Sequence, residues 1–406
     1  KKRIDDRVAE LFVPVILIIS LLTFFIWVFF GGIDVVSHGL FAALSVLVVA
    51  CPCVVGLATP VALAAGLNKA ARNHILIRDT SALEQMRNVD VVVFDKTGTL
   101  TEGHPTVIGW LWAQGQEEHY KDVLLAAEST SDHPLAEAIV TALEGEEQVI
   151  PAHLDGFESI AGKGVRVAYQ GAEYWVGSHK LLKDYQANLS DILADMLTQY
   201  ESDGNSIVYF GRENDLLAVI AIKDQLRVTS MEAIRELRIQ DIEICMLTGD
   251  GERTASSVAG SLGIMRFVAD AMPDDKEDFI HKLQLQGKTV AMVGDGVNDA
   301  RALSCADVSI AMGKGTDTLM DTAMITLRTS DLLLLPKVFR LSRQTVSLMY
   351  RNLFWAFIYN TVGIFVAAGV LYPVYDILLS PALAGAAMAL SCVSVALSSL
   401  RLSSRF

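Results

Sequence analysis

Asp95-Lys96-Thr97-Gly98-Thr99-Leu100-Thr101 directly follows the apolar run Val91-Val92-Val93-Phe94, and this segment is the most informative part of the sequence. The four apolar residues predict a buried strand, and the glycine and threonines predict a loop at its carboxyl end. Open α/β sheets hold their ligands at that edge. A carboxylate placed there can attack a phosphoryl group and become an aspartyl phosphate. Asp95 is therefore the candidate nucleophile.

Two further apolar runs end in loops of the same kind. Residues 243–247 precede Thr248-Gly249-Asp250, and residues 289–293 precede Gly294-Asp295-Gly296-Val297-Asn298-Asp299. This repetition predicts a doubly wound α/β sheet with its ligand loops at one edge. The first two strands lie more than a hundred residues apart, and a single crossover is far shorter, so we expect a second domain between them.

The composition indicates a protein with both membrane and soluble parts. Of 406 residues 52% are hydrophobic and 20% charged, with a mean hydropathy of +0.38. Four apolar segments are long enough to cross a bilayer: 11–30, 40–63, 353–372 and 378–400. The loops 31–39 and 373–377 contain no Lys or Arg, whereas the other flanks do. The positive-inside rule therefore predicts cytoplasmic termini and a cytoplasmic middle segment.

Charge and cysteine content exclude other classes. The net charge of −14 argues against nucleic acid as a partner. Five cysteines do not form a secreted disulfide framework, and Cys245 and Cys305 are expected to be small buried apolar residues. Because the first residue is Lys1 and not Met, we expect the chain to begin inside a longer polypeptide or after a removed segment.

The residues around Asp95 supply what phosphoryl transfer needs, which is positioning and charge neutralisation. Candidate catalytic residues are Asp95, Lys96, Thr97, Thr248, Gly249, Asp250, Lys276 and Asn298. Candidate Mg²⁺ ligands are Asp95, Thr97, Asp295 and Asp299, because Mg²⁺ prefers hard oxygen donors. Soluble phosphatases with such a sheet commonly carry a second Asp two residues after the nucleophile, where this chain has Thr97. We therefore expect the aspartyl phosphate to persist after its formation.

Cys51-Pro52-Cys53 in the second apolar segment predicts a site for a soft metal ion. Thiolates select Cu(I), Ag(I) or Zn(II) over hard cations, and Pro52 distorts the helix, so both sulfurs can reach one pathway. Tyr359, Asn360, Met388 and Ser391 are candidate ligands in the last two segments, whose middles contain no Lys, Asp or Glu. A divalent ion would need a compensating carboxylate, so this set favours a monovalent ion.

Together these motifs resemble the P-type ATPases, and with the Cys-Pro-Cys, Tyr-Asn and Met-x-x-Ser patterns they resemble the copper(I)-exporting branch of the heavy-metal pumps. The resemblance implies a multi-pass helical membrane domain and a haloacid dehalogenase-like phosphorylation domain with an inserted α+β nucleotide-binding domain. The implied domains are 1–72 (first two spans), 73–106 and 221–345 (phosphorylation), 107–220 (nucleotide binding) and 346–406 (last two spans). It also implies that Glu128, His133, Gly162 and Gly164 bind ATP and that Asp224 and Arg227 form a hinge.

The resemblance further implies ATP-driven export of Cu(I) or Ag(I) from the cytoplasm of a cell, with a bacterial inner membrane and a copper chaperone as the expected setting. No Thr-Gly-Glu tripeptide of the actuator domain occurs, so this carboxyl-terminal part is expected to accept a phosphoryl group without completing the cycle. Phe365, Cys392 and Ser178 depart from the family pattern. Three alternatives stay open: a Zn(II) or Cd(II) pump, a membrane-anchored phosphatase or phosphotransferase that transports nothing, and a metal-binding module that does not pump.

Overall fold

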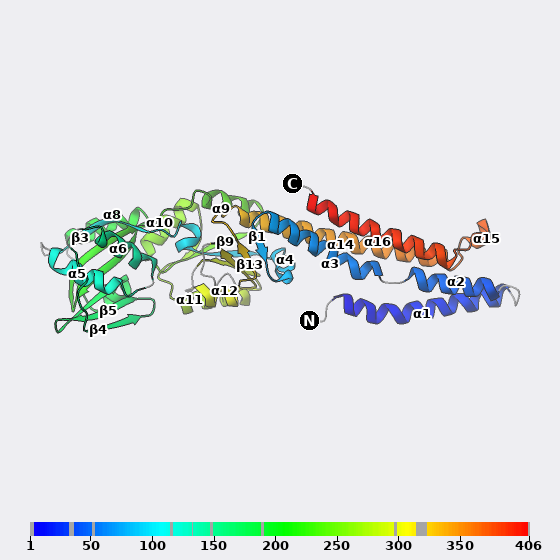
Figure 1. The fold of residues 1–406 in the computed structure, drawn as a ribbon, viewed down its shortest axis with the longest axis horizontal. Coiled ribbons are helices and arrows are strands. Elements are labelled where there is room, and N and C mark those ends of the chain that lie inside the picture. Colours follow the sequence, from blue (N-terminus) through cyan, green and yellow to red (C-terminus); the bar gives the residue numbers. More distant parts are fainter. Residues whose placement is uncertain are drawn as a thin grey trace. The chain divides into compact units, whose positions relative to one another are not determined.

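The computed structural model describes residues 4–31, 36–50, 53–113, 117–131, 133–146, 149–187, 191–295, 299–313 and 323–404. The chain separates into two compact units, and each is described by itself (Figure 1). One unit contains Lys1–Asn73 and Val338–Phe406, and the other contains His74–Lys337.

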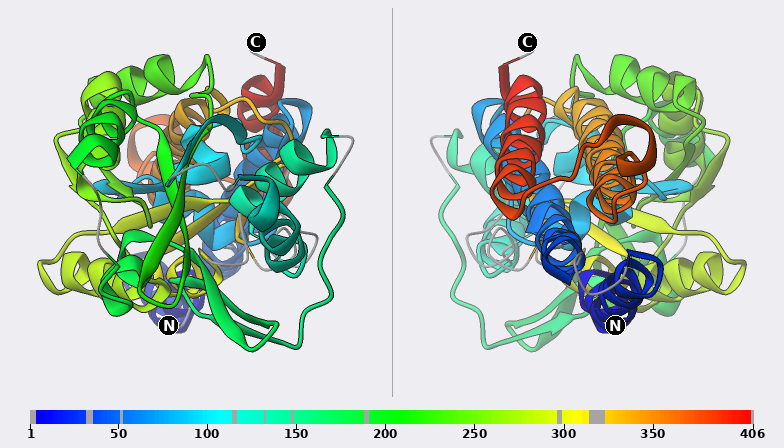
Figure 2. Two further views of the ribbon diagram at one scale, coloured as in Figure 1. Left: turned by 90° about the vertical axis from the view of Figure 1, so that its left-hand side faces the viewer. Right: turned by 90° about the vertical axis from the view of Figure 1, so that its right-hand side faces the viewer.

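The first unit is helical. Its helices are α1 (Ile4–Gly31), α2 (Val36–Val49), α3 (Cys53–Arg72), α14 (Leu334–Ala367), α15 (Tyr372–Tyr375) and α16 (Pro381–Ser404). Helix α2 packs against α1, and α16 packs against α2 and α3, as the end-on view in Figure 2 (right) shows. Large apolar side chains face outward, among them Phe29 and Phe30 at 84% and 82% exposure. Such surfaces are unfavourable in water and favourable in lipid.

Only one helix among the described residues, Pro381–Arg401, is long and apolar enough to cross a bilayer. Pro14–Phe30 and Val36–Val49 are apolar but shorter. The predicted second span, 40–63, is not one continuous helix, because α2 ends at Val49 and α3 begins at Cys53. Helices usually end at or before the residue that precedes a proline, and Cys51 precedes Pro52 in this sequence. Helix α14 stops at Ala367, five residues before the end of the predicted third span at residue 372.

The second unit contains two sheets. The larger consists of β1 (Ile75–Ile77), β2 (Val91–Asp95), β9 (Glu243–Leu247), β10 (Arg266–Val268), β11 (Val290–Gly294), β12 (Val308–Met312) and β13 (Ile325–Leu327). Their order is β1-β13-β12-β11-β2-β9-β10, and all neighbours are parallel except β1 and β13. Every residue of β2, β11 and β12 is buried, as expected for parallel strands covered on both faces. Associated helices are α4 (Thr80–Met86), α9 (Ser230–Ile239), α10 (Glu252–Leu262), α11 (Pro273–Leu285) and α12 (Ala300–Cys305).

Strand register brings the predicted loops to one edge of this sheet. Asp95 pairs with Leu247, and Phe94 pairs with Val293, so β2, β9 and β11 end at the same level. The loops that follow these three strands therefore start side by side.

The smaller sheet lies, in sequence, wholly between β2 and β9. It is antiparallel, in the order β3-β8-β7-β6-β5-β4, and comprises β3 (Thr106–Trp112), β4 (Gly156–Ile160), β5 (Gly164–Tyr169), β6 (Ala172–Gly177), β7 (Ser206–Arg212) and β8 (Asp215–Lys223). Helices α5 (Glu117–Glu128), α6 (Pro134–Glu144), α7 (His179–Asp184) and α8 (Asp191–Ser202) accompany it. Its first and last strands pair with each other, with Thr106 opposite Lys223.

Candidate active site

The loop after β2 folds tightly around Gly98. This residue has φ +72°, and a Cβ on it would overlap with the carboxylate of Asp295. Its N–H donates to Thr101 Oγ1 at 2.9 Å. Only glycine allows this conformation and this approach together, so Gly98 sets the distance between the two loops.

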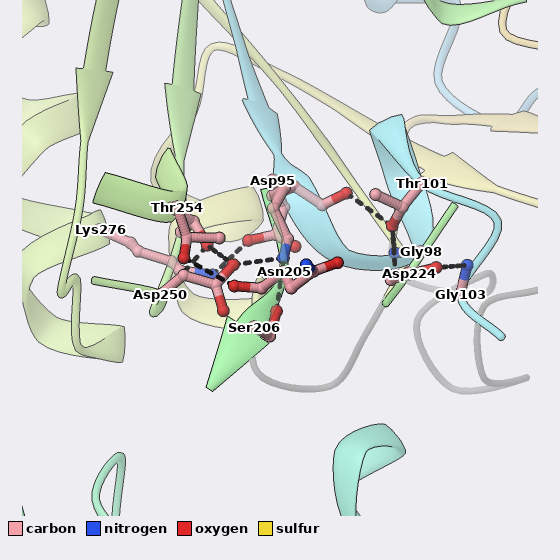
Figure 3. A network of polar contacts seen from close by, with 12 residues as sticks. Asp95, Gly98, Thr101, Gly103, Asn205, Ser206, Asp224, Asp250, Thr254 and Lys276 are labelled. Atoms are coloured by element: carbon pink, nitrogen blue, oxygen red, sulfur yellow. Dashed lines mark hydrogen bonds and ion pairs between the residues drawn. The ribbon is translucent and has the colours of Figure 1, made fainter. Parts of the chain in front are cut away.

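Two residues after β8 hold the same loop from its other side. Arg227 donates from Nε to the carbonyl oxygen of Thr99 at 3.0 Å and from Nη2 to that of Gly98. Asp224 accepts from Thr101 Oγ1 at 2.5 Å and from the Gly103 N–H at 3.1 Å (Figure 3). The predicted hinge residues are thus bonded directly to the loop that carries Asp95. Sequence reasoning gave Thr101 no role, although threonine side chains often form hydrogen bonds with neighbouring backbone groups.

Asp95 lies at the end of β2 and is 6% exposed. Lys276, near the start of α11, donates to Asp95 Oδ1 and, at 2.8 Å, to Asp299 Oδ1. Burial alone would lower the pKa of Lys276, but the carboxylates of Asp95 and Asp299 raise it above its usual range. Lys276 is therefore a fixed cation beside the candidate nucleophile.

Three carboxylates converge at this point. Oxygens of Asp95, Asp295 and Asp299 lie within 4.8 Å of one another. Burial, reinforced by the negative charge of Asp95, raises the pKa of both Asp295 and Asp299 to about 7. One lysine does not offset three carboxylates, and clustered carboxylate oxygens are the ligands that Mg²⁺ prefers. The residues present thus fit the predicted Mg²⁺ site.

Lys96 points into a second network. Its ammonium group bonds to Asp250 and, at 3.1 Å, to Ser206 Oγ. Thr248 Oγ1 donates to Asp250 Oδ2 at 3.0 Å. Burial alone would raise the pKa of Asp250, but the charge of Lys96 and the hydrogen bonds lower it below its usual value. Asp250 is therefore an anion held by the ammonium group of Lys96. Ser206, which the sequence analysis missed, belongs to the same hydrogen-bond network.

Ser206 begins strand β7 of the inserted sheet, and its neighbour Asn205 directly precedes that strand. Thr254 of α10 donates to the Asn205 carbonyl oxygen at 2.7 Å (Figure 3). No motif marks these two residues, because they act through their place at the start of β7. The structure thus joins the two sheets at Lys96 and Thr254.

The predicted nucleotide residues all lie on the inserted domain. Glu128 ends α5 and is buried, and His133 caps α6 by accepting the Leu135 N–H at Nδ1 over 3.2 Å. That bond leaves the other ring nitrogen, Nε2, as the donor of the neutral imidazole. Gly162, with φ +69°, lies in the turn between β4 and β5, and Gly164, with φ +144°, is the first residue of β5. His133 lies close enough to Asp250 and Asp95 for their charges to act on its imidazole.

Glu128→Gln is expected to stabilise the chain by about 3 kcal/mol at pH 8 and not at pH 4.5. Burial raises the pKa of Glu128 from 4.5 to about 7. The folded state therefore keeps this proton up to about pH 7, and the associated stability is lost as pH rises through that value. Urea unfolding at both pH values measures the effect. The exposed Glu137→Gln on α6 is the control, and an equal gain in both variants would contradict the assignment.

The candidate metal residues of the helical unit separate into two groups. Asn360 and Ser391 are buried, and neither side chain has a hydrogen-bond partner among the described residues. Met388 packs with Cys392 in an apolar cluster, whereas Tyr359 is 41% exposed. Cys51, Asn298 and the side chain of Cys53 lie outside the described residues. The structure therefore leaves two polar groups buried and unpaired, which is costly without a ligand.

The expectation for Cys305 is wrong. Cys245 is fully buried in β9, but Cys305 at the end of α12 is only partly buried. Its thiol faces Glu277 Oε1 at 3.4 Å. The sequence around Cys305 gave no sign of this contact, because Glu277 comes from another helix.

Comparison with known proteins identifies the class. The family model of haloacid dehalogenase-like hydrolases matches residues 89–307, and the chain belongs to this family. A copper-exporting P-type ATPase of Legionella pneumophila is 42% identical over 401 residues, which are 99% of this chain and 54% of that protein. A silver-exporting P-type ATPase of Salmonella typhimurium is 43% identical over 406 residues, 99% of this chain and 49% of that protein. The chain thus spans about half the length of these relatives.

Solved structures agree. A zinc-transporting PIB-type ATPase in the E2.Pi state matches with a TM-score of 0.71 and 32% identity, over 99% of this chain and 64% of that one. The catalytic domain of a CPx-ATPase matches with a TM-score of 0.56 and 28% identity, over 67% of this chain and 96% of that one. The resemblance to heavy-metal P-type ATPases, predicted from the motifs, is confirmed.

Proposed function

We propose that Asp95 accepts the γ-phosphoryl group of ATP and forms an aspartyl phosphate. The observation that carries this is the buried carboxylate of Asp95 at the carboxyl edge of the sheet, bonded to Lys276 and within 4.8 Å of Asp295 and Asp299. A carboxylate oxygen attacks the γ-phosphorus, the bond to the β–γ bridging oxygen breaks, and ADP leaves with the electron pair. Mg²⁺ bound by Asp95, Asp295, Asp299 and Thr97 would neutralise charge on the transferring group.

The other residues have positioning roles. Lys276 holds Asp95 in place and faces the phosphoryl oxygens, and Thr248 with Asp250 fixes Lys96 beside the entering group. In the sequence, Gly249 follows β9 and Asn298 follows β11. Thr97 offers no carboxylate to take a proton from water, so the acyl phosphate is stored and not discharged. Glu128, His133, Gly162 and Gly164 hold the nucleotide on the inserted domain.

We propose that the stored phosphate drives export of Cu(I) or Ag(I) through the helical unit. Buried, uncharged and unpaired Asn360 and Ser391 support a ligand path for a soft monovalent ion, together with Met388, Tyr359, Cys51 and Cys53. Relatives named for copper and silver export support the same ions. The Lys and Arg residues that flank the four predicted spans support a cytoplasmic two-sheet unit at a bacterial inner membrane, where a copper chaperone is the expected donor.

A zinc or cadmium pump is the second candidate, because a structure similar to this chain is that of a zinc-transporting ATPase. The two candidates differ in which ion triggers phosphorylation. Membranes containing the protein are incubated with Mg²⁺, labelled ATP and Cu(I), Ag(I) or Zn(II), and the acid-stable phosphoenzyme is counted. Copper and silver are expected to stimulate labelling, and stimulation by zinc alone would overturn the copper proposal.

In that assay Asn360→Ala is expected to reduce the Cu(I)-stimulated phosphate labelling about tenfold. The free energy of unfolding should not fall, because the alanine removes a buried amide that has no hydrogen-bond partner among the described residues. Asn352 of the same helix is the matched control: it is also buried, but it donates to Ser399 Oγ at 3.0 Å. Asn352→Ala should cost about 1 kcal/mol and leave the response to copper intact. The opposite pattern would place the metal path elsewhere.

A further inference from the structure

A second group of metal-ligating side chains lies away from the three carboxylates, between α11 and α12. Glu277 and His281 are four residues apart on α11, and Cys305 ends α12. One ligand atom from each lies within 4.8 Å of the others. His281 Nε2 is 3.7 Å from Glu277 Oε1, and Cys305 Sγ is 3.4 Å from the same oxygen. Three donors from two adjacent helices thus point to one place.

Hydrogen bonds fix the imidazole of His281 for ligation. Gln284 donates from Nε2 to the Cys305 carbonyl oxygen at 2.9 Å and to Asp307 at 3.2 Å. Both partners only accept, so the amide nitrogen must face them and Oε1 must face His281 Nδ1, at 3.2 Å. In the neutral imidazole Nδ1 therefore carries the proton, which leaves the lone pair of Nε2, on the side of Glu277, for a metal ion. Metal-binding histidines are typically held in this way by a second acceptor.

The donor set selects the ion. A thiolate, an imidazole and a carboxylate suit Zn(II), which takes four ligands, and a water completes the set. Cu(I) prefers sulfur and imidazole and makes little use of a carboxylate. The His281 side chain is 51% exposed and that of Glu277 is 34% exposed, so an ion can enter from solvent.

We propose that Glu277, His281 and Cys305 bind one Zn(II) ion, with a water as the fourth ligand and loss of the Cys305 proton on binding. The place of this ion has a consequence for the active site. Glu277 directly follows Lys276, and α12 begins directly after Asp299. A bound ion would fasten together the two helices that position Lys276 and Asp299 around Asp95. The proposal does not depend on the transported ion.

Cobalt titration of the purified full chain tests the site, because Co(II) bound to a thiolate gives a near-ultraviolet charge-transfer band. Cys51→Ser, Cys53→Ser and Cys392→Ser are introduced first, so that the thiols of the helical unit cannot contribute. We expect this parent to bind one Co(II) with that band and Zn(II) to displace it. Cys305→Ser should abolish the band, and Glu277→Gln should weaken binding at least about 100-fold, whereas Gln284→Ala should weaken it about tenfold.

Asp278→Asn is the matched control, because Asp278 is exposed and adjoins Glu277. This substitution removes the same charge as Glu277→Gln. It should change Co(II) affinity less than about twofold, since a solvated neighbour contributes little. Zinc should also raise the unfolding temperature of the parent but not of Cys305→Ser. A parent without the band, a band that persists in Cys305→Ser, or equal losses in Glu277→Gln and Asp278→Asn would each overturn the proposal.

Discussion

Asp95→Asn is expected to lower phosphate incorporation from ATP by at least about 10³-fold, to the background of the assay. Asparagine keeps the shape of the side chain and can still accept from Lys276, so the loop around Gly98 should remain folded. The amide oxygen is too weak a nucleophile to attack phosphorus. The measurement is acid-stable, hydroxylamine-labile label on the chain after incubation with Mg²⁺, ATP and Cu(I).

Asp90→Asn is the control for this change. Asp90 precedes β2 at the opposite end from Asp95, where its carboxylate accepts the Thr289 N–H at 2.8 Å. The Asn oxygen can keep that bond, so labelling should stay within about twofold of the parent. Substantial labelling of Asp95→Asn would mean that another residue is phosphorylated, and it would contradict the proposed role of Asp95.

Gly98→Ala is expected to lower phosphorylation about 10²-fold, even where the chain still folds. The new Cβ would overlap with the Asp295 carboxylate and push it away from Asp95 and Asp299. A displacement of about 1 Å at a reacting centre is enough for a loss of this size. Mg²⁺ dependence of the labelling should shift to higher concentration in the same variant, because one of the three carboxylates has moved.

Gly287→Ala separates this overlap from backbone strain. Gly287 has φ +79°, close to the φ of Gly98, but no atom lies within 4 Å of an added Cβ. Both alanines therefore cost about 1–2 kcal/mol of left-handed strain, and only Gly98→Ala disturbs Asp295. If both variants lost the same activity, strain and not the contact between the two loops would be the cause.

The central strands could be predicted because their signal is local. Residues 91–94, 243–247 and 289–293 are apolar runs with a Gly/Asp loop after each, and the structure has strands at 91–95, 243–247 and 290–294. The helical unit was harder. Hydropathy alone cannot show where a long apolar run breaks, and the run 40–63 is divided between α2 and α3. Apolar length gives the reach of a segment, but backbone hydrogen bonding decides its ends.

The site was predictable to the extent that motifs carry it. The structure brings together four predicted residues, as the prediction of ligand loops at one edge of the sheet required: Asp95, Lys276, Asp295 and Asp299. Ser206 and the group Glu277, His281 and Cys305 could not be found in this way. Their proximity depends on how helices and sheets pack, and a spacing of 24 residues between His281 and Cys305 has no meaning until α11 and α12 lie side by side.

The pairing of β3 with β8 has a consequence for how the chain folds. Strands β2 and β9 are neighbours, yet the whole inserted sheet separates them in sequence, and closing such a long loop is slow and entropically costly. If the insertion folds first, Thr106 and Lys223 are brought together before β2 and β9 meet. The flexible part of the loop then shortens about fivefold, which lowers its closure cost by about 1.4 kcal/mol. We therefore expect the nucleotide domain to form early and to act as an internal template for the sheet that carries Asp95.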